Sequence, residues 1–149
     1  MKYPKGTFYS LAFAASLVVA SVCFGEEAYT KTTHTTTILK TTVDTAGQKI
    51  EYPKNGTAEL TGVLVEIPAG AQTGWHVHES PCVAYVLEGE IAVELETGVT
   101  NHFKAGDSFA EVRNLKHCGY NTGKTPVKIL LFAIGVEGTP VSKATSTAK

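Results

Sequence analysis

Apolar and polar residues alternate along most of the chain between positions 57 and 134. Alternation with a period of two places every second side chain on the same face of a β-strand. The pattern predicts strands over residues 57–67, 90–96, 99–103, 108–112, 116–121 and 126–134. Clusters of Gly, Pro, Asn and Asp separate these segments, and no segment after residue 25 has a helical period. The expected fold class is therefore all-β, an antiparallel sandwich or barrel.

The segments on either side of this region lack its regular alternation. Residues 26–56 form a Thr-rich arm followed by two short β-branched runs, 38–43 and 48–52, which we expect to be edge strands. Residues 135–149 are small and polar, and we expect a flexible C-terminal tail there. The chain therefore holds one expected domain, a β-barrel over residues 57–134.

The N-terminal residues have the pattern of an export signal. Lys2 and Lys5 precede an apolar run over residues 11–24, which is shorter than a membrane-spanning helix. We expect a signal peptide over residues 1–25, cleaved after Gly25. An uncleaved anchor and lipidation of Cys23 are the alternatives. Export predicts a periplasmic or secreted protein that has no stable membrane association after cleavage.

The composition is that of a globular domain with an ordinary charge balance. Hydrophobic residues make up 43% of the chain and charged residues 18%, which favours a packed core over disorder. The formal net charge is −1, and no basic stripe runs through the sequence. We therefore expect no nucleic-acid partner.

Two histidines flank a single valine within the stretch GAQTGWHVHESPCVAYVLEG, residues 70–89. On a strand, His76 and His78 point to the same side, with backbones about 6–7 Å apart. Both imidazoles can then share one metal ion. His34 in the Thr-rich arm and His102 in a hairpin are expected to be exposed bystanders.

This stretch and a later one resemble the two sequence motifs of the cupin superfamily. The first motif, G-x5-H-x-H-x3,4-E-x6-G, is matched at Gly70, His76, His78 and Gly89, with Cys82 at its Glu position. The second, G-x5-P-x-G-x2-H-x3-N, is matched at Gly106, His117 and Asn121, with Val112 and Asn114 at its Pro and Gly positions. The resemblance covers residues 57–134 and implies an antiparallel jelly-roll barrel, or double-stranded β-helix.

The resemblance implies a metal site built from His76, His78 and His117, with barrel closure bringing the third histidine opposite the other two. Imidazole ligands suit a divalent transition metal, here Fe, Zn, Mn, Ni or Cu. Three histidines leave coordination positions open to water or substrate, which is typical of catalytic sites. The resemblance also implies a homodimer, since compact cupins commonly pair through their outer strands.

Cys82 is the main departure from the motif, and three interpretations of it stay open. Its sulfur is a fourth, thiolate ligand of the metal, a thiol beside the metal or substrate, or a small buried hydrophobic group. Glu79 is either a replacement carboxylate or a solvated loop acid. Cys118 follows His117 and should point away from the barrel interior, so we expect no disulfide between Cys82 and Cys118.

We expect an exported metal-dependent enzyme, oxygenase-like, that acts on a small organic molecule. The alternatives are a non-catalytic periplasmic protein that binds a metal or a small ligand, and a metal-dependent lyase or isomerase. The fold class does not separate them, because one fold hosts many functions. Val65, Ala84 and Phe132 are expected to line an apolar pocket, and Trp75 to face the other side of its strand.

Overall fold

The computed structural model describes residues 32–146 of the chain. The predicted signal peptide, residues 1–25, lies outside the described residues. The chain divides into two units, residues 1–35 and 36–149, and every described strand belongs to the second unit. Among the described residues, no helix is long and apolar enough to cross a membrane.

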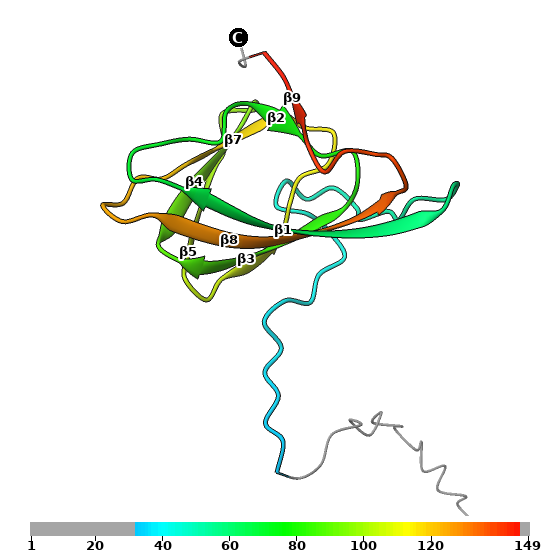
Figure 1. Ribbon diagram of the computed structural model, residues 1–149, viewed down its shortest axis with the longest axis horizontal. Coiled ribbons are helices and arrows are strands. Elements are labelled where there is room, and N and C mark those ends of the chain that lie inside the picture. The colour runs from blue at the N-terminus through cyan, green and yellow to red at the C-terminus, as the bar shows by residue number, and fades with distance from the viewer. Residues whose placement is uncertain (1–31, 147–149) are drawn as a thin grey trace, which may run out of the picture. The chain divides into compact units, whose positions relative to one another are not determined.

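Nine strands in the described part of the second unit form two antiparallel sheets (Figure 1). The four-stranded sheet consists, in spatial order, of β1 (Ala58–Ile67), β8 (Val127–Val136), β3 (Cys82–Glu88) and β6 (Ser108–Ala110). The five-stranded sheet consists of β5 (Thr100–Lys104), β4 (Glu90–Leu95), β7 (His117–Tyr120), β2 (His76–Val77) and β9 (Lys143–Ala144). The described residues contain strands but no helix, which confirms the predicted all-β class.

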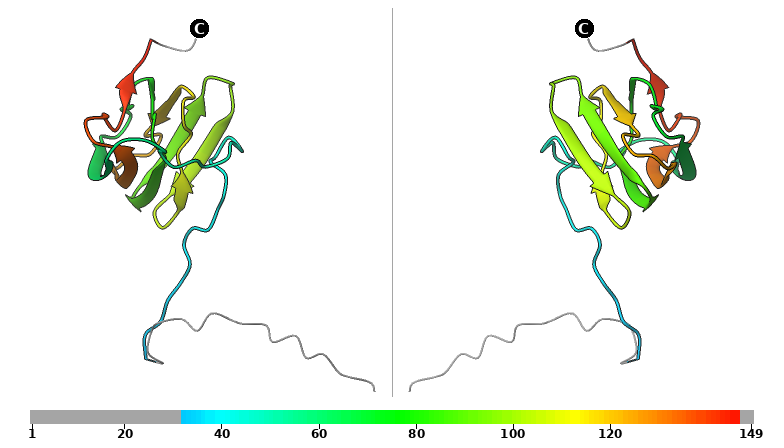
Figure 2. Two further views of the ribbon diagram at one scale, coloured as in Figure 1. Left: turned by 90° about the vertical axis from the view of Figure 1, so that its right-hand side faces the viewer. Right: turned by 90° about the vertical axis from the view of Figure 1, so that its left-hand side faces the viewer.

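Both sheets contribute side chains to one apolar core, and Figure 2 shows the two sheets from either side. Burial alternates along β8, as a period of two requires. The buried cluster takes one face of each sheet: Ile67, Ala84, Val86, Ile91, Val93, Leu95, Phe109, Val112, Val127 and Ile129. This packing fixes which side of each strand faces the space between the sheets.

Of the three residues expected to line an apolar pocket, two face the core and one does not. Ala84 is fully buried in the core, and Val65 packs against it. Phe132 instead lies on the outer face with 49% of its surface exposed. Because its neighbours Leu131 and Ala133 are buried, the residue between them must point outward.

The segment before β1 differs from the two predicted edge strands. One isolated bridge joins Val43 and Lys49, and the Ile50 amide donates to the Thr42 carbonyl at 3.0 Å, but neither side forms a named strand. The Asp44 carboxylate accepts hydrogen bonds from the backbone amides two and four residues later, both at 2.9 Å. It also accepts one from the Arg113 amide at 3.4 Å. The Asp44 side chain therefore holds the turn that joins the two sides of this short pairing.

The C-terminal segment differs from the flexible tail predicted for residues 135–149. β8 continues to Val136, and β9 pairs with β2. The Thr145 amide also donates to the Trp75 carbonyl at 2.9 Å. The small polar residues of this segment have the composition of a flexible tail, which is why the sequence predicts one. Their backbone groups nevertheless pair with β2, whose edge would otherwise be open. The segment after β8 thus becomes part of the five-stranded sheet.

Candidate metal centre

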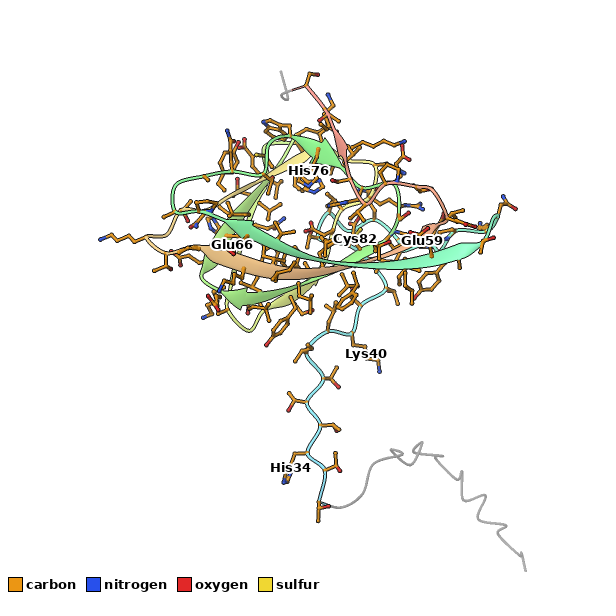
Figure 3. The ribbon with its side chains drawn as sticks, in the orientation of Figure 1. His34, Lys40, Glu59, Glu66, His76 and Cys82 are labelled. Atoms are coloured by element: carbon orange, nitrogen blue, oxygen red, sulfur yellow. The ribbon has the colours of Figure 1, made fainter. Side chains whose placement is uncertain are left out.

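His76, His78 and His117 lie together on the side of the five-stranded sheet that faces the other sheet. His76 on β2 pairs directly with His117 on β7, and His78 follows at the end of β2. The ring centroids are 4.3 Å apart for His76 and His117 and 5.0 Å apart for each pair that includes His78. Their ligand nitrogens all lie within 4.8 Å of one another. Figure 3 shows His76 and Cys82 among the strands of the second unit.

Each of the three imidazoles donates a hydrogen bond through Nδ1 to a backbone carbonyl. For His76, His78 and His117, the Nδ1–O distances are 2.9 Å to Gly74, 2.7 Å to Val141 and 2.9 Å to Leu115. Because a carbonyl oxygen only accepts, the proton of each neutral ring is on Nδ1 and the lone pair is on Nε2. Metal-binding histidines are commonly fixed in this way through their second ring nitrogen.

Burial keeps two of these imidazoles neutral. Loss of hydration lowers the pKa of His117 to about 4, and burial likewise lowers the pKa of His78. The Nε2 atoms of both rings are buried and have no hydrogen-bond partner among the described residues. Because an unpartnered buried acceptor is costly, a cation between these nitrogens would relieve that cost. The donor set therefore fits a divalent transition metal ion.

A cavity of about 510 Å³ opens beside the three histidines. Its wall is largely apolar and is formed by both sheets: Val63, Val65, Ile129 and Leu131 from one, Ile91 and Val93 from the other. Val141 and Thr145, next to β9, close another side. A volume of this size suits a small organic molecule.

Trp75 lines this cavity, contrary to the expectation that it faces the other side of its strand. The strand begins only at His76, and Trp75 lies in the bend before it. The alternation rule therefore does not apply to Trp75. Its indole adds to the apolar wall next to the first histidine.

Cys82 is a buried thiol beside the cluster, with 2% of its surface exposed. Its Sγ donates to the carbonyl of Ser80, at an Sγ–O distance of 3.4 Å. Burial, and to a smaller extent the charge of Glu111, raises the pKa of Cys82 to about 12. The hydrogen bond to Ser80, and the absence of Cys82 from the group of ligand atoms within 4.8 Å of one another, favour the interpretation of Cys82 as a thiol beside the site.

Cys118 is buried on the other side of β7 from the metal ligands. Its Sγ lies 3.4 Å from Oε1 of Gln72 and 4.0 Å from Oγ1 of Thr73. Both Cys82 and Cys118 are free. Cys118 lies on β7 of the five-stranded sheet and Cys82 on β3 of the other sheet, and Cys118 points away from its neighbour His117, as expected from alternation.

Glu111 is the polar group of the site that sequence reasoning missed. One carboxylate oxygen, Oε2, lies 3.8 Å from His117 Nε2, and the side chain is 10% exposed. Burial raises the pKa of Glu111 to about 7. Since burial also favours neutral His117, this contact is not an ion pair of the metal-free protein at neutral pH. The sequence does hold a signal for Glu111. Phe109 and Glu111 are two positions apart and therefore share one face of a strand, and the apolar Phe109 indicates that this face points inward.

The remaining candidates are not part of the three-histidine group. Glu79 is exposed, and its carboxylate pairs with the Lys143 ammonium at 2.7 Å. This contact favours the interpretation of Glu79 as a loop acid. His34 and His102 are both exposed, as expected.

Comparisons with known proteins agree with this architecture. The Cupin domain family matches residues 63–133. No curated protein matches the sequence. A chain from the structures of the DMSP lyases RdDddP and RnDddQII is 17% identical, with a TM-score of 0.51, and the alignment covers 58% of this chain and 44% of that one. DMSP lyase DddQ from Ruegeria pomeroyi DSS-3 is 23% identical over 58% of this chain and 43% of that one, with a TM-score of 0.51.

An oxalate oxidase structure is 23% identical over 51% of this chain and 42% of that one, with a TM-score of 0.47. The chain therefore spans less than half the length of these lyase and oxidase chains. At such identities the likeness concerns the fold. Two antiparallel sheets around inward-facing histidines define a small β-barrel of the jelly-roll class. Residues 63–133 thus match the Cupin domain family, and the fold of the described chain agrees with that match.

Proposed function

We propose that this cupin is a metal-dependent enzyme that acts on a small organic molecule. His76, His78 and His117 would hold one divalent transition metal ion through Nε2. The observation that carries this proposal is the set of three carbonyl-fixed imidazoles facing one 510 Å³ cavity. Among the described residues, this is the one group with three ligand atoms within 4.8 Å.

A bound ion would supply Lewis-acid chemistry and, if it is redox-active, oxygen chemistry. The residues of the chain position the reactants. The carbonyls of Gly74, Leu115 and Val141 hold the three rings in place. The apolar wall removes water from a bound substrate, which strengthens the electrostatic interactions within the cavity.

We favour an oxygenase-like reaction because three protein ligands leave coordination positions open on a redox-active ion. Non-catalytic ligand binding and a lyase or isomerase reaction would use the same residues. The identity of the metal separates these functions, since oxygen chemistry needs a redox-active ion whereas Lewis-acid chemistry does not.

Elemental analysis of the full chain, expressed without a histidine tag, tests the proposal. It is combined with oxygen-uptake assays on a panel of small organic acids, phenols and thiols. We expect about one equivalent of a redox-active metal and oxygen uptake with at least one compound. Folded His117→Ala, checked by circular dichroism, should lose both. Stoichiometric zinc without oxygen uptake would contradict the oxygenase proposal and favour a lyase or isomerase.

We also propose export by a signal peptide over residues 1–25. The support is the pair Lys2 and Lys5 before the apolar run over residues 11–24. N-terminal sequencing of protein recovered from the periplasm or medium should begin at Glu26. Recovery of the intact N-terminus from the cytoplasm would contradict this proposal.

We further propose that two copies pair through the outer face of the four-stranded sheet. Leu60, Leu64 and Phe132 on this face are 77%, 62% and 49% exposed. An apolar sheet face of this kind is typical of an interface between proteins. Light scattering after size exclusion should give a dimer for the wild type and a monomer for Leu64→Lys. Val99→Lys, at another exposed apolar position, is the matched control and should remain dimeric.

A further inference from the structure

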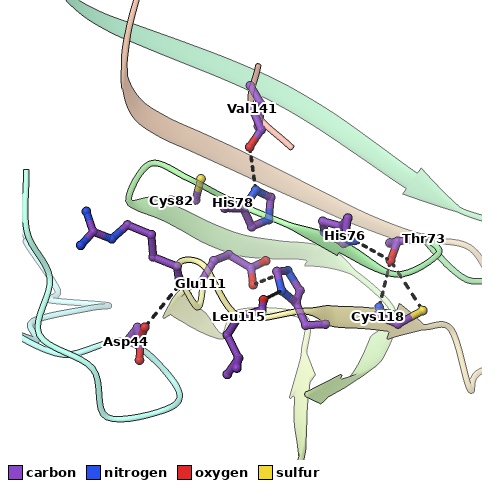
Figure 4. A network of polar contacts seen from close by, with 12 residues as sticks. Asp44, Thr73, His76, His78, Cys82, Glu111, Leu115, Cys118 and Val141 are labelled. Carbon is purple, nitrogen blue, oxygen red and sulfur yellow. Dashed lines mark hydrogen bonds and ion pairs between the residues drawn. The ribbon is translucent and has the colours of Figure 1, made fainter. Parts of the chain in front are cut away.

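The three histidines supply only neutral ligand atoms, so a site built from them alone carries no negative charge. The Cys82 thiol is directed to the Ser80 carbonyl at an Sγ–O distance of 3.4 Å, and Cys82 is not in the group of ligand atoms that lie within 4.8 Å of one another. A buried carboxylate lies next to it. The Glu111 amide donates to the Cys82 carbonyl at 2.9 Å, which places these two residues side by side. Figure 4 shows Glu111 and Cys82 within one network of polar contacts.

The Glu111 carboxylate faces a metal-ligand atom directly. Its Oε2 lies 3.8 Å from Nε2 of His117, and 10% of the Glu111 side chain is exposed (Figure 4). Two donor atoms that each lie about 2.1 Å from one ion are at most about 4.2 Å apart. The observed separation is below that limit, so this pair of atoms can bind one ion. Glu111 is outside the group of ligand atoms that all lie within 4.8 Å of one another, so its carboxylate must rotate toward the other two histidines to complete a four-ligand site.

The two facing atoms do not satisfy each other. His117 donates through Nδ1 to Leu115, so Nε2 presents a lone pair. The carboxylate also presents lone pairs, and 3.8 Å is too long for a hydrogen bond. His117 Nε2 consequently has no hydrogen-bond partner among the described residues. A cation between Nε2 and Oε2 gives both acceptors a partner.

We propose that Glu111 is the fourth, anionic ligand of the metal site and binds through Oε2. This inference rests on the proposed function, because it requires that the three histidines bind a metal ion. Cys82 then remains a small thiol that leaves room for the Glu111 side chain from the neighbouring segment. A set of three imidazoles and one carboxylate suits Fe²⁺ or Mn²⁺ better than a set with a thiolate would.

Titration of the metal-free full chain with Co²⁺, followed by calorimetry and by visible absorption, tests this inference. Glu111→Gln keeps the size of the side chain and removes its charge. We expect it to weaken Co²⁺ binding by about 10-fold to 100-fold and to change the visible Co²⁺ spectrum. The matched control is Glu79→Gln, which removes an exposed carboxylate that pairs with Lys143 instead of facing the site. It should retain wild-type affinity and spectrum.

Two further variants separate the possible failures. If the wild type binds Co²⁺ and His78→Ala does not, but folded Glu111→Gln binds with wild-type affinity and spectrum, the inference is wrong and the three-histidine site stands. A sulfur-to-cobalt charge-transfer band that disappears in Cys82→Ser, with Glu111→Gln unchanged, would assign the fourth position to Cys82. If the wild type binds no Co²⁺, the proposed function fails and the inference fails with it.

Discussion

Backbone carbonyls fix the positions of the protons on the three site histidines. Each Nδ1–H donates to a carbonyl, so each Nε2 faces the cavity as a lone pair. Burial reinforces this arrangement by lowering the pKa of His117 and of His78. The residues are therefore ready to bind a cation at neutral pH without first losing protons.

Glu111 should make the stability of the metal-free protein depend on pH. Burial raises its pKa from an ordinary 4.5 to about 7, so its contribution to stability is present below pH 4.5 and is lost as pH rises to 7. We expect the free energy of unfolding of Glu111→Gln, relative to wild type, to increase by at most about 3 kcal/mol across that window. Urea unfolding of chelator-treated protein measures this difference. A difference that does not vary with pH would contradict the account.

Cys82 and Cys118 should be inert in the folded protein. At about pH 8, a thiol whose pKa is about 12 is thiolate in roughly one molecule in 10⁴, and Cys118 is fully buried. We expect alkylation without reductant to modify both cysteines only after denaturation, as measured by peptide mass spectrometry. A disulfide-linked peptide pair containing both residues would be the contrary result.

Among the elements, β9 and the segment before it hold the candidate ligand His78 in place. The carbonyl of Val141, two residues before β9, accepts the Nδ1 proton of His78 at 2.7 Å. Truncation after residue 138 removes this carbonyl and β9 together. We expect Co²⁺ affinity to fall by about 10-fold to 100-fold, measured by calorimetry. Lys143→Ala removes only the exposed pair with Glu79 and should leave the affinity unchanged. Equal affinities for the truncated and full chains would show that β9 has no such role.

The elements also show how far the sequence predicts the structure. Alternation predicts β1, β5 and β8 well, because more exposed and less exposed positions alternate along each of them. It does not predict β9, a two-residue strand of exposed residues that exists through pairing with β2, more than 60 positions earlier. The expected edge strands 38–43 and 48–52 are likewise reduced to an isolated bridge, beside a turn held by the Asp44 carboxylate.

Motif spacing identifies His76, His78 and His117 because their positions along two strands are nearly fixed by the fold. Glu111 is different, since its place beside Cys82 depends on the register between two strands. A sequence shows which residues share a face of one strand, but register between strands depends on packing across the whole sheet. The three neutral histidines of the site can thus be predicted from the sequence, whereas the position of the buried Glu111 carboxylate is seen only in the structure.

At the scale of the whole molecule, a metal ion should stabilise the fold. An ion that binds only the folded state adds about 2.7 kcal/mol when its free concentration is 100 times its Kd. For a domain of this size, that raises Tm by about 10–20 °C. Calorimetry should show this rise when metal is returned to chelator-treated wild type, and no rise for His78→Ala. Equal shifts in both proteins would indicate binding elsewhere on the molecule.

The most direct test of the account is anomalous X-ray diffraction from crystals of the metal-loaded protein, measured at the absorption edge of the bound ion. We predict one anomalous peak, about 2.0–2.2 Å from the Nε2 atoms of His76, His78 and His117. The same peak should lie within bonding distance of Oε2 of Glu111. A fully loaded crystal without a peak between these histidines would contradict the central claim that they form a metal centre.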